Sequence, residues 1–274
     1  MKEATHRKRP YAPLTMAVTS GKGGVGKTTM AVNLGVHFVS KGRKVLLVDG
    51  DLGLANVDIM FGVRPDYNFH HLISGERSID EIIVKGPSGI HFLPASSGLP
   101  ELADLNPEQQ MMVLGQLETL EQRYDIILID TAAGIGSNVL HFAAAAHYVL
   151  VVVTHEPTSL ADSYAVIKIL RQRYNVRRFQ LVVNSSHSEQ AALRVYQTLS
   201  DIADSFIDVV IDYMGYIPRD ENVSRSISAQ RPFLDMFPSS PCSVALRNLG
   251  EALLAKRVQS ASEETPLLWS RIIE

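Results

Sequence analysis

The chain has 274 residues, a formal net charge of −3, and 46% hydrophobic and 20% charged residues, which is the composition of an ordinary globular protein. This charge argues against a nucleic-acid binder, which needs a basic face, and the single cysteine, Cys242, excludes an internal disulfide or a cysteine-based metal centre. No apolar run of about 18 residues is present, so no membrane-spanning helix is predicted. The lone cysteine favours the reducing cytoplasm, with a peripheral place on the inner face of the cell membrane left open.

Residues 1–13 are polar and basic and contain two prolines, which predicts a flexible arm. From 14 to 257, short apolar runs alternate with amphipathic stretches, as in repeated strand–helix units. The predicted strands are 15–20, 44–49, 90–94, 125–130, 148–154, 179–184 and 209–217. The predicted helices are 27–40, 107–123, 137–146, 157–173, 188–206 and 239–255. Runs such as YVLVVV lack polar alternation, which predicts an α/β fold with one doubly wound, mostly parallel sheet covered by helices on both faces.

A glycine-rich stretch, GKGGVGKTT, lies between the first predicted strand and the first predicted helix. It matches the phosphate-loop pattern of Gly, four residues, Gly, Lys and Ser or Thr. Such a loop turns backbone N–H groups toward phosphate oxygens, and the following helix adds its partial positive charge. We therefore predict that a nucleotide is bound by Gly21, Lys22, Gly23, Gly24, Val25, Gly26, Lys27, Thr28 and Thr29.

Three side chains of this loop have distinct expected tasks. Lys27 is placed to reach the β- and γ-phosphates, and the Thr28 hydroxyl is the expected Mg²⁺ ligand. Lys22, a second lysine, cannot easily share one phosphate with Lys27 but could reach a nucleotide held by a facing subunit. The alternative for Lys22 is a solvated lysine at the mouth of the loop.

Carboxylates follow two of the later predicted strands. Asp49 and Asp51 end a buried strand, where strand alternation points both carboxylates toward the phosphates. Their alternative task is to cap the following turn. Asp130 ends the apolar run IILID and is expected to hold a Mg²⁺-bound water, while Gly134 and Gly136 allow a sharp turn that senses the γ-phosphate.

Together these motifs resemble the deviant Walker A signature of the MinD/ParA family of P-loop ATPases, over about 14–255. The resemblance implies ATP and Mg²⁺ as cofactors and an ATP-bound homodimer in which Lys22 contacts the partner's nucleotide. It implies that Asp51 positions the attacking water, with Lys27 and Lys22 as further catalytic residues, and that Asp49 and Asp130 lie at the metal. Hydrolysis is expected to be slow, because the carboxylate is placed only when the dimer closes. The adenine-binding positions of the family correspond to Asn184, Pro218, Arg219 and Asp220.

Three stretches, DGDLGLANVDIMFG, DTAAGIG and EPTSLADSYAVIK, resemble the FlhG/FleN flagellar-number regulators more than MinD proper or ParA. This implies an ATP-dependent dimer that restrains flagellar number and placement through an FlhF-type GTPase, a switch-complex component or a flagellar transcriptional activator. Residues 1–14 lack the Asp-Gln-Ala motif by which many members stimulate the GTPase. Two other functions stay open: a nucleotide-stabilised module that sequesters a transcription factor, and an ATPase that positions other cargo, such as septum, chromosome or plasmid.

Two surface features bear on partners. Arg171, Arg173, Arg177 and Arg178 form the candidate basic cluster, which we interpret as solvated charges near a helix end, so direct DNA binding is not expected. Residues 258–274 are predicted to form a linker and a short amphipathic helix with Trp269 on its apolar face. The resemblance implies peripheral membrane contact through this helix, but its glutamates leave docking on the protein's own surface or on a partner equally open.

Overall fold

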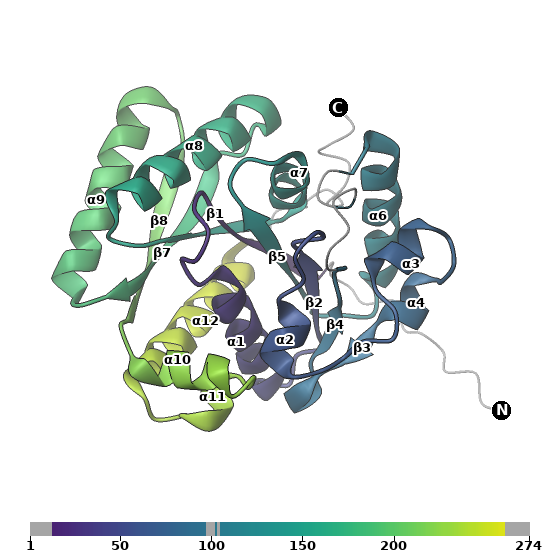
Figure 1. Cartoon of the computed structure of the whole chain (residues 1–274). Helices are drawn as coiled ribbons and strands as arrows, with labels where there is room; N and C mark the ends of the chain where they lie inside the picture. The colour runs from purple at the N-terminus through teal and green to yellow at the C-terminus, as the bar shows by residue number, and fades with distance from the viewer. Residues whose placement is uncertain (1–12, 97–101, 103–104, 261–274) are drawn as a thin grey trace.

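An eight-stranded sheet forms the centre of this computed structural model, which describes residues 13–96, 102 and 105–260 (Figure 1). The strands are β1 (Leu14–Ser20), β2 (Val45–Gly50), β3 (Val84–Lys85), β4 (His91–Leu93), β5 (Ile126–Ala133), β6 (Tyr148–Val153), β7 (Arg178–Ser186) and β8 (Val210–Pro218). They lie in the order β3-β4-β2-β5-β1-β6-β7-β8, and only the β3–β4 pair is antiparallel. The predicted fold class is confirmed.

Helices cover both faces of the sheet. The longer ones are α1 (Lys27–Ser40), α6 (Pro107–Leu120), α7 (Ser137–Ala145), α8 (Pro157–Tyr174), α9 (Glu189–Phe206) and α12 (Pro241–Ser260). The shorter ones are α2 (Val57–Phe61), α3 (Phe69–Ile73), α4 (Ile79–Ile82), η1 (Pro87–Gly89), α10 (Glu221–Ser228) and α11 (Phe233–Met236). Figure 1 shows α1 and α12 on one face of the sheet and α7 and α8 on the other.

The strands are apolar on both sides because each side packs against helices. In β1, Met16 and Val18 join a hydrophobic cluster with α1 and α12, whereas Ala17 between them joins a cluster with α8 and α9. A third cluster, under α3, α4 and α6, covers the β2 side of that second face. Burial on both faces explains why these strands read as continuous apolar runs. It also leaves the carboxyl ends of the parallel strands as the place where polar side chains gather.

The structure adds elements that the periodicity did not predict. The strand β3 and the helices α2, α3, α4, α10 and α11 have eight residues or fewer, too few for a helical or alternating pattern to emerge. The last helix continues to Ser260, five residues beyond its predicted end at 255 and into the predicted linker. The predictions for residues 1–12 and 261–274, including the amphipathic helix, lie outside the described residues.

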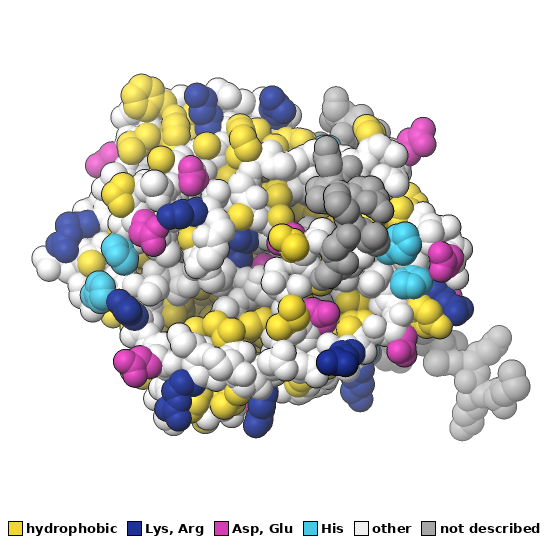
Figure 2. Space-filling model, in the orientation of Figure 1, with side chains coloured by type: hydrophobic (Ala, Val, Ile, Leu, Met, Phe, Trp, Pro, Cys, Tyr) yellow, Lys and Arg dark blue, Asp and Glu magenta, His cyan; other side chains and the backbone are white. Residues whose placement is uncertain are grey.

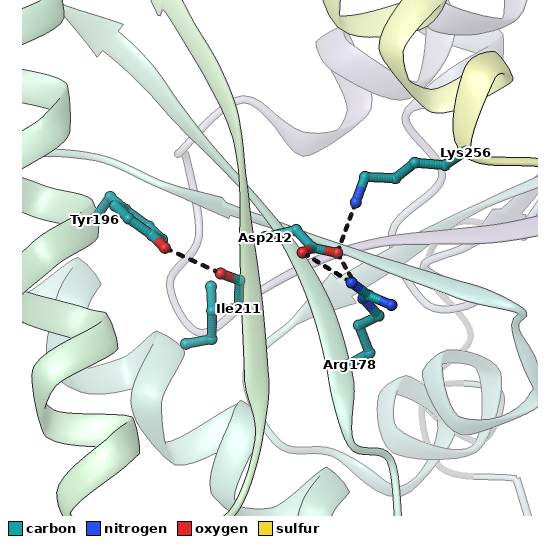
Figure 3. A network of polar contacts seen from close by, with 5 residues as sticks. All are labelled: Arg178, Tyr196, Ile211, Asp212 and Lys256. Carbon is teal, nitrogen blue, oxygen red and sulfur yellow. Dashed lines mark hydrogen bonds and ion pairs between the residues drawn. The ribbon is translucent and has the colours of Figure 1, made fainter. Parts of the chain in front are cut away.

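Three of the four arginines of the basic cluster form ion pairs with two aspartates. Arg178 Nε and Lys256 Nζ lie 2.8 and 2.7 Å from Asp212 Oδ2 at the start of β8 (Figure 3). Arg171 and Arg177 each lie 3.5 Å from Asp208 Oδ2. On the face in Figure 2, Lys and Arg side chains are scattered rather than gathered in one patch. Arg177 and Arg178, with 63% and 64% of their side chains exposed, fit the interpretation as solvated charges, whereas Arg171 is 22% exposed.

The described residues include no helix that is both long enough and apolar enough to cross a membrane.

Candidate nucleotide-binding site

The glycine-rich loop joins the end of β1 to the start of α1, as the motif predicts. Gly24 and Gly26 have φ angles of 75° and 96°, in the left-handed region that favours glycine. Gly26 directly precedes the first turn of α1, and no side chain caps that helix end. The first N–H groups of a helix have no partner within it, so the arrangement of this loop and helix end is one that can bind an anion.

The first glycine of the loop lies directly on the backbone of α8. A Cβ added at Gly21 would lie 2.0 Å from the carbonyl carbon of Asp162 and 2.4 Å from the nitrogen of Ser163. Backbone atoms inside a helix cannot move aside, so this position tolerates no side chain. Val25, in contrast, is buried in the core with 4% of its surface exposed, and it contributes its backbone to the loop.

Lys27 and Asp130 form the charged centre of the site. Burial lowers the pKa of Lys27, and the neighbouring carboxylates Asp130 and Asp51 act in the opposite direction. Burial raises the pKa of Asp130 to about 7, while the Thr28 hydroxyl and Lys27 oppose that rise. Burial therefore favours the neutral form of Asp130, and a nearby positive charge favours the charged form.

The surroundings of Asp130 fit a divalent cation. The side chain is 1% exposed, and among the described residues neither of its oxygens accepts a hydrogen bond of good geometry. Unpaired buried carboxylate oxygens are costly unless something coordinates them, and carboxylate and hydroxyl oxygens are the ligands that Mg²⁺ prefers. Thr28 lies near enough to lower the pKa of Asp130, so these two residues would hold the metal.

The two aspartates after β2 have different surroundings. Asp49 is fully buried, and its Oδ2 accepts the N–H groups of Asn56 and Val57 at 3.0 and 3.1 Å. Its Oδ1 accepts Asp51 N–H at 3.3 Å. Asp49 thus anchors the loop that carries Asp51, as the turn-capping alternative holds, and its place at the metal stays a prediction.

Asp51 itself is half-buried beside Lys27. Burial raises the pKa of Asp51, and Lys27 counteracts that rise. The exposed apolar residues Leu54 and Ile59 follow Asp51 in the loop and in α2, with 67% and 54% of their surfaces exposed. A carboxylate in this half-open position can accept a hydrogen bond from water, which is what orienting a nucleophilic water requires.

Lys22 is held by the N-terminus of α8. Its Nζ forms an ion pair with Glu156 and donates a 2.9 Å hydrogen bond to Thr158 Oγ1. This pair lowers the pKa of Glu156. In this structure Lys22 therefore points to its own chain's α8. With 36% of its side chain exposed it remains partly solvated at the mouth of the loop, so both predicted tasks of Lys22 stay predictions. Contact with a partner's nucleotide requires that the ion pair be released.

The loop after β5 is joined to the phosphate loop at its base. Gly134, with a φ of 90°, donates its N–H to Ser20 O at 2.9 Å, and Thr131 Oγ1 donates to Val18 O at 3.2 Å. Asp130 lies within β5 rather than at its end, because the strand runs three residues farther than predicted, to Ala133. Because of these hydrogen bonds, a movement of this loop would also displace the end of β1.

The predicted adenine-binding residues serve structural contacts here. Asn184 Nδ2 donates to Val25 O at 2.7 Å. Asp220 caps α10 through Asn222 N–H at 2.9 Å and also accepts Cys242 N–H at 3.4 Å, so it joins α10 to α12. Pro218 and Arg219 lie at the end of β8, where Arg219 N–H donates to Ser186 O. Their contact with a base stays a prediction.

Sequence reasoning missed the partners of the loop. Glu156 and Thr158 lie in the stretch EPTSLADSYAVIK, but nothing in the spacing connects them to Lys22, more than 130 residues earlier. The same holds for Asn184 and Val25. Only the strand order, which puts β6 beside β1 and β7 beside β6, brings these residues together.

Comparisons with known proteins identify relatives of this chain. A family model described as an AAA domain matches residues 14–183. The antiactivator FleN of Pseudomonas aeruginosa is 39% identical over 236 residues, which cover 86% of this chain and 84% of that protein. The flagellum site-determining protein YlxH of Helicobacter pylori is 30% identical and covers 92% of this chain and 85% of its own length.

A solved structure shares the fold. The cell division ATPase MinD of Pyrococcus furiosus has a TM-score of 0.76 and 24% identity, over 89% of this chain and 99% of that one. At this identity the likeness supports the architecture, in which the glycine-rich loop follows the central strand of a parallel sheet.

Proposed function

We propose that this chain, which belongs to the MinD/ParA family of P-loop ATPases, is a Mg²⁺- and ATP-dependent switch that regulates the number and placement of flagella. The observation that carries this proposal is the 39% identity to the antiactivator FleN, which extends over 86% of the chain rather than over the phosphate loop alone. The similarity to a flagellum site-determining protein supports the same role.

The site supports slow ATP hydrolysis. Lys27 and the loop N–H groups neutralise the phosphates, and Asp51, half-buried beside Lys27, orients the attacking water. A Mg²⁺ ion held near Asp130 and Thr28 would supply charge neutralisation between the β- and γ-phosphates. Catalysis in this reaction class depends on alignment of the water with the terminal phosphate together with electrostatic stabilisation of the transferred group.

The switch would operate through Lys22. In the single chain Lys22 is bound to Glu156 and Thr158, so an exchange of these contacts for the phosphates of a second copy connects nucleotide binding to dimer formation. Hydrolysis would remove the γ-phosphate and return Lys22 to α8. The free energy of the Lys22–Glu156 pair then opposes dimerisation in the absence of ATP.

Dimerisation is tested by light scattering with Mg²⁺–ATP. Asp51→Ala is expected to elute as a stable dimer with ATP, because the nucleotide is not consumed, and Asp51→Ala combined with Lys22→Ala is expected to elute as a monomer. A monomeric Asp51→Ala protein at saturating ATP would refute the switch. Phosphate release per chain should rise with protein concentration if the dimer is the active form.

The flagellar role is tested by counting flagella by negative-stain microscopy in the source organism after deletion of the gene. An excess or misplacement of flagella, restored by the intact gene but not by Lys22→Ala, is expected. An unchanged count would refute the flagellar role and leave the ATPase switch in place, with septum, chromosome or plasmid as the alternative cargo.

A second candidate follows from the word antiactivator in the name of the P. aeruginosa relative. It is a nucleotide-stabilised module that binds and sequesters a transcriptional activator, for which turnover is incidental. The two candidates differ in Asp51→Ala: full biological activity of this variant, together with its loss in Lys22→Ala, would favour sequestration. The FlhF-type GTPase and the switch-complex component remain the other proposed partners, and peripheral membrane contact remains a proposal for residues 258–274.

A further inference from the structure

We propose that Asn184 is a positioning residue for the phosphate loop, which sets the direction of a phosphate-binding N–H group independently of the nucleotide base. This inference rests on the proposed ATP-binding function. Asn184 lies at the carboxyl end of β7, two strands away from β1, and is half-buried. Its side chain reaches back to the glycine-rich loop between β1 and α1.

The contact is tight and uses both ends of the amide. Asn184 Nδ2 donates to Val25 O at 2.7 Å, and Asn184 Oδ1 accepts Ser185 N–H at 2.9 Å. The second bond fixes the side chain relative to its own strand, where Ser185 has a φ of 54°. A Cβ added at Gly26 would lie 2.4 Å from Nδ2, so the loop can approach this closely only because residue 26 is glycine.

The planar peptide bond between Val25 and Gly26 links the hydrogen bond from Asn184 to the direction of the Gly26 N–H group. The carbonyl of Val25 and the N–H of Gly26 belong to one planar unit, and no cis peptide occurs in the described residues, so the two groups point in opposite directions. By holding the carbonyl toward β7, Asn184 turns the Gly26 N–H away from β7. Gly26 precedes the first turn of α1, where N–H groups have no partner within the helix and bind phosphate.

The alternative task of Asn184, contact with adenine, makes a different prediction. A residue that binds the base contributes nothing to a ligand without a base. A residue that orients the loop contributes equally to ATP and to inorganic tripolyphosphate, since both present the same phosphate chain. Binding of these two probes, measured by isothermal titration calorimetry with Mg²⁺ present, therefore separates the two tasks.

Two variants and one control carry the test. Asn184→Ala removes the whole amide, and Asn184→Asp keeps the shape and the bond to Ser185 but places a carboxylate oxygen against Val25 O. We expect both variants to bind ATP and tripolyphosphate more weakly by the same factor, about five- to tenfold or more, as for loss of one orienting hydrogen bond. Ser188→Ala, which removes only the exposed cap of α9, should bind both probes like the unchanged protein.

Each outcome decides the inference. If ATP binding falls while tripolyphosphate binding is unchanged, Asn184 binds the base and the inference is wrong. If neither affinity changes in Asn184→Ala, which removes the bond to Val25 O without adding a charge, the inference is also wrong. Failure of the unchanged protein to bind either probe would instead refute the proposed function. Thermal melts of each variant separate a loss of orientation, which lowers affinity at low temperature, from a loss of folded protein.

Discussion

Replacing Asp130 by asparagine should make the nucleotide-free protein more stable and, at the same time, unable to hold Mg²⁺. Asp130 is 1% exposed, and within the described residues its oxygens have no hydrogen-bond partner of good geometry. Such a carboxylate destabilises the folded state whenever it is ionised. An amide of the same shape carries no charge and avoids that cost.

The size of the gain follows from the pKa. Burial raises the pKa of Asp130 from 3.8 to about 7. One pKa unit corresponds to about 1.4 kcal/mol, so full ionisation costs the folded state up to about 4 kcal/mol. The carboxyl of Asp130 binds its proton more tightly in the folded chain than in the unfolded chain. The protonated carboxyl therefore contributes its full stabilisation below about pH 4, and this contribution is lost as the pH rises to about 7. The advantage of asparagine should therefore be largest above pH 7, between about 2 and 4 kcal/mol, and should shrink as the pH falls.

Urea unfolding in EDTA, at several pH values between 5 and 8.5, measures this difference. Asp66→Asn, at an exposed position, is the matched control and should leave the stability unchanged within about 0.5 kcal/mol. The reasoning is refuted if Asp130→Asn is no more stable than the unchanged protein at pH 8, or if its advantage grows as the pH falls. The same variant should lose Mg²⁺-dependent phosphate release.

Three further outcomes are expected. Asp49→Ala should lower the free energy of unfolding by about 2 kcal/mol, because the buried N–H groups of Asn56 and Val57 lose their acceptor. Amide hydrogen exchange should become faster at residues 51–57, and unchanged exchange there would contradict the anchoring role of Asp49. Gly21→Ala should lower the free energy of unfolding, measured by thermal melts, by at least about 2 kcal/mol. Gly23→Ala is the control: an added Cβ there would have its nearest neighbour atom at 4.0 Å, so the loss should be less than about 0.5 kcal/mol. Equal losses would count against the packing argument. Glu156→Ala should lower the ATP concentration at which dimers form in light scattering, because Lys22 then keeps only the hydrogen bond to Thr158. A higher threshold would show that the pair assists dimerisation.

The sheet could be predicted from the sequence because its strands are buried on both faces and therefore lack polar alternation. Every predicted strand has a counterpart, and β5 differs mainly by continuing through Thr131 to Ala133. The short elements α2, α3 and α4 could not be predicted, since their four or five residues show no period and their helical form depends on tertiary contacts. Local propensity alone does not specify such helices.

The candidate site was predictable in its parts but not in its internal contacts. The loop motif and Asp130 are contiguous patterns, so the sequence reveals them directly. The task of Asp49 is different, because a carboxylate after a strand serves equally well as a metal ligand or as an acceptor for its own loop. Only the turn of the chain back toward Asn56 decides that its oxygens are occupied by backbone N–H groups.

The wedged position of Gly21 against α8 has a mechanical consequence. The backbone of Gly21 lies so close to α8 that a Cβ there would come within 2.0 Å of the carbonyl carbon of Asp162, so this end of the loop has little room to move. Strain from binding or loss of a γ-phosphate must then be released elsewhere, in the segments after β2 and β5 that carry Asp51 and Gly134. A partner that distinguishes the ATP-bound from the ADP-bound protein should therefore contact those two segments. A spectroscopic probe attached to α1 should show no change in signal between the two states.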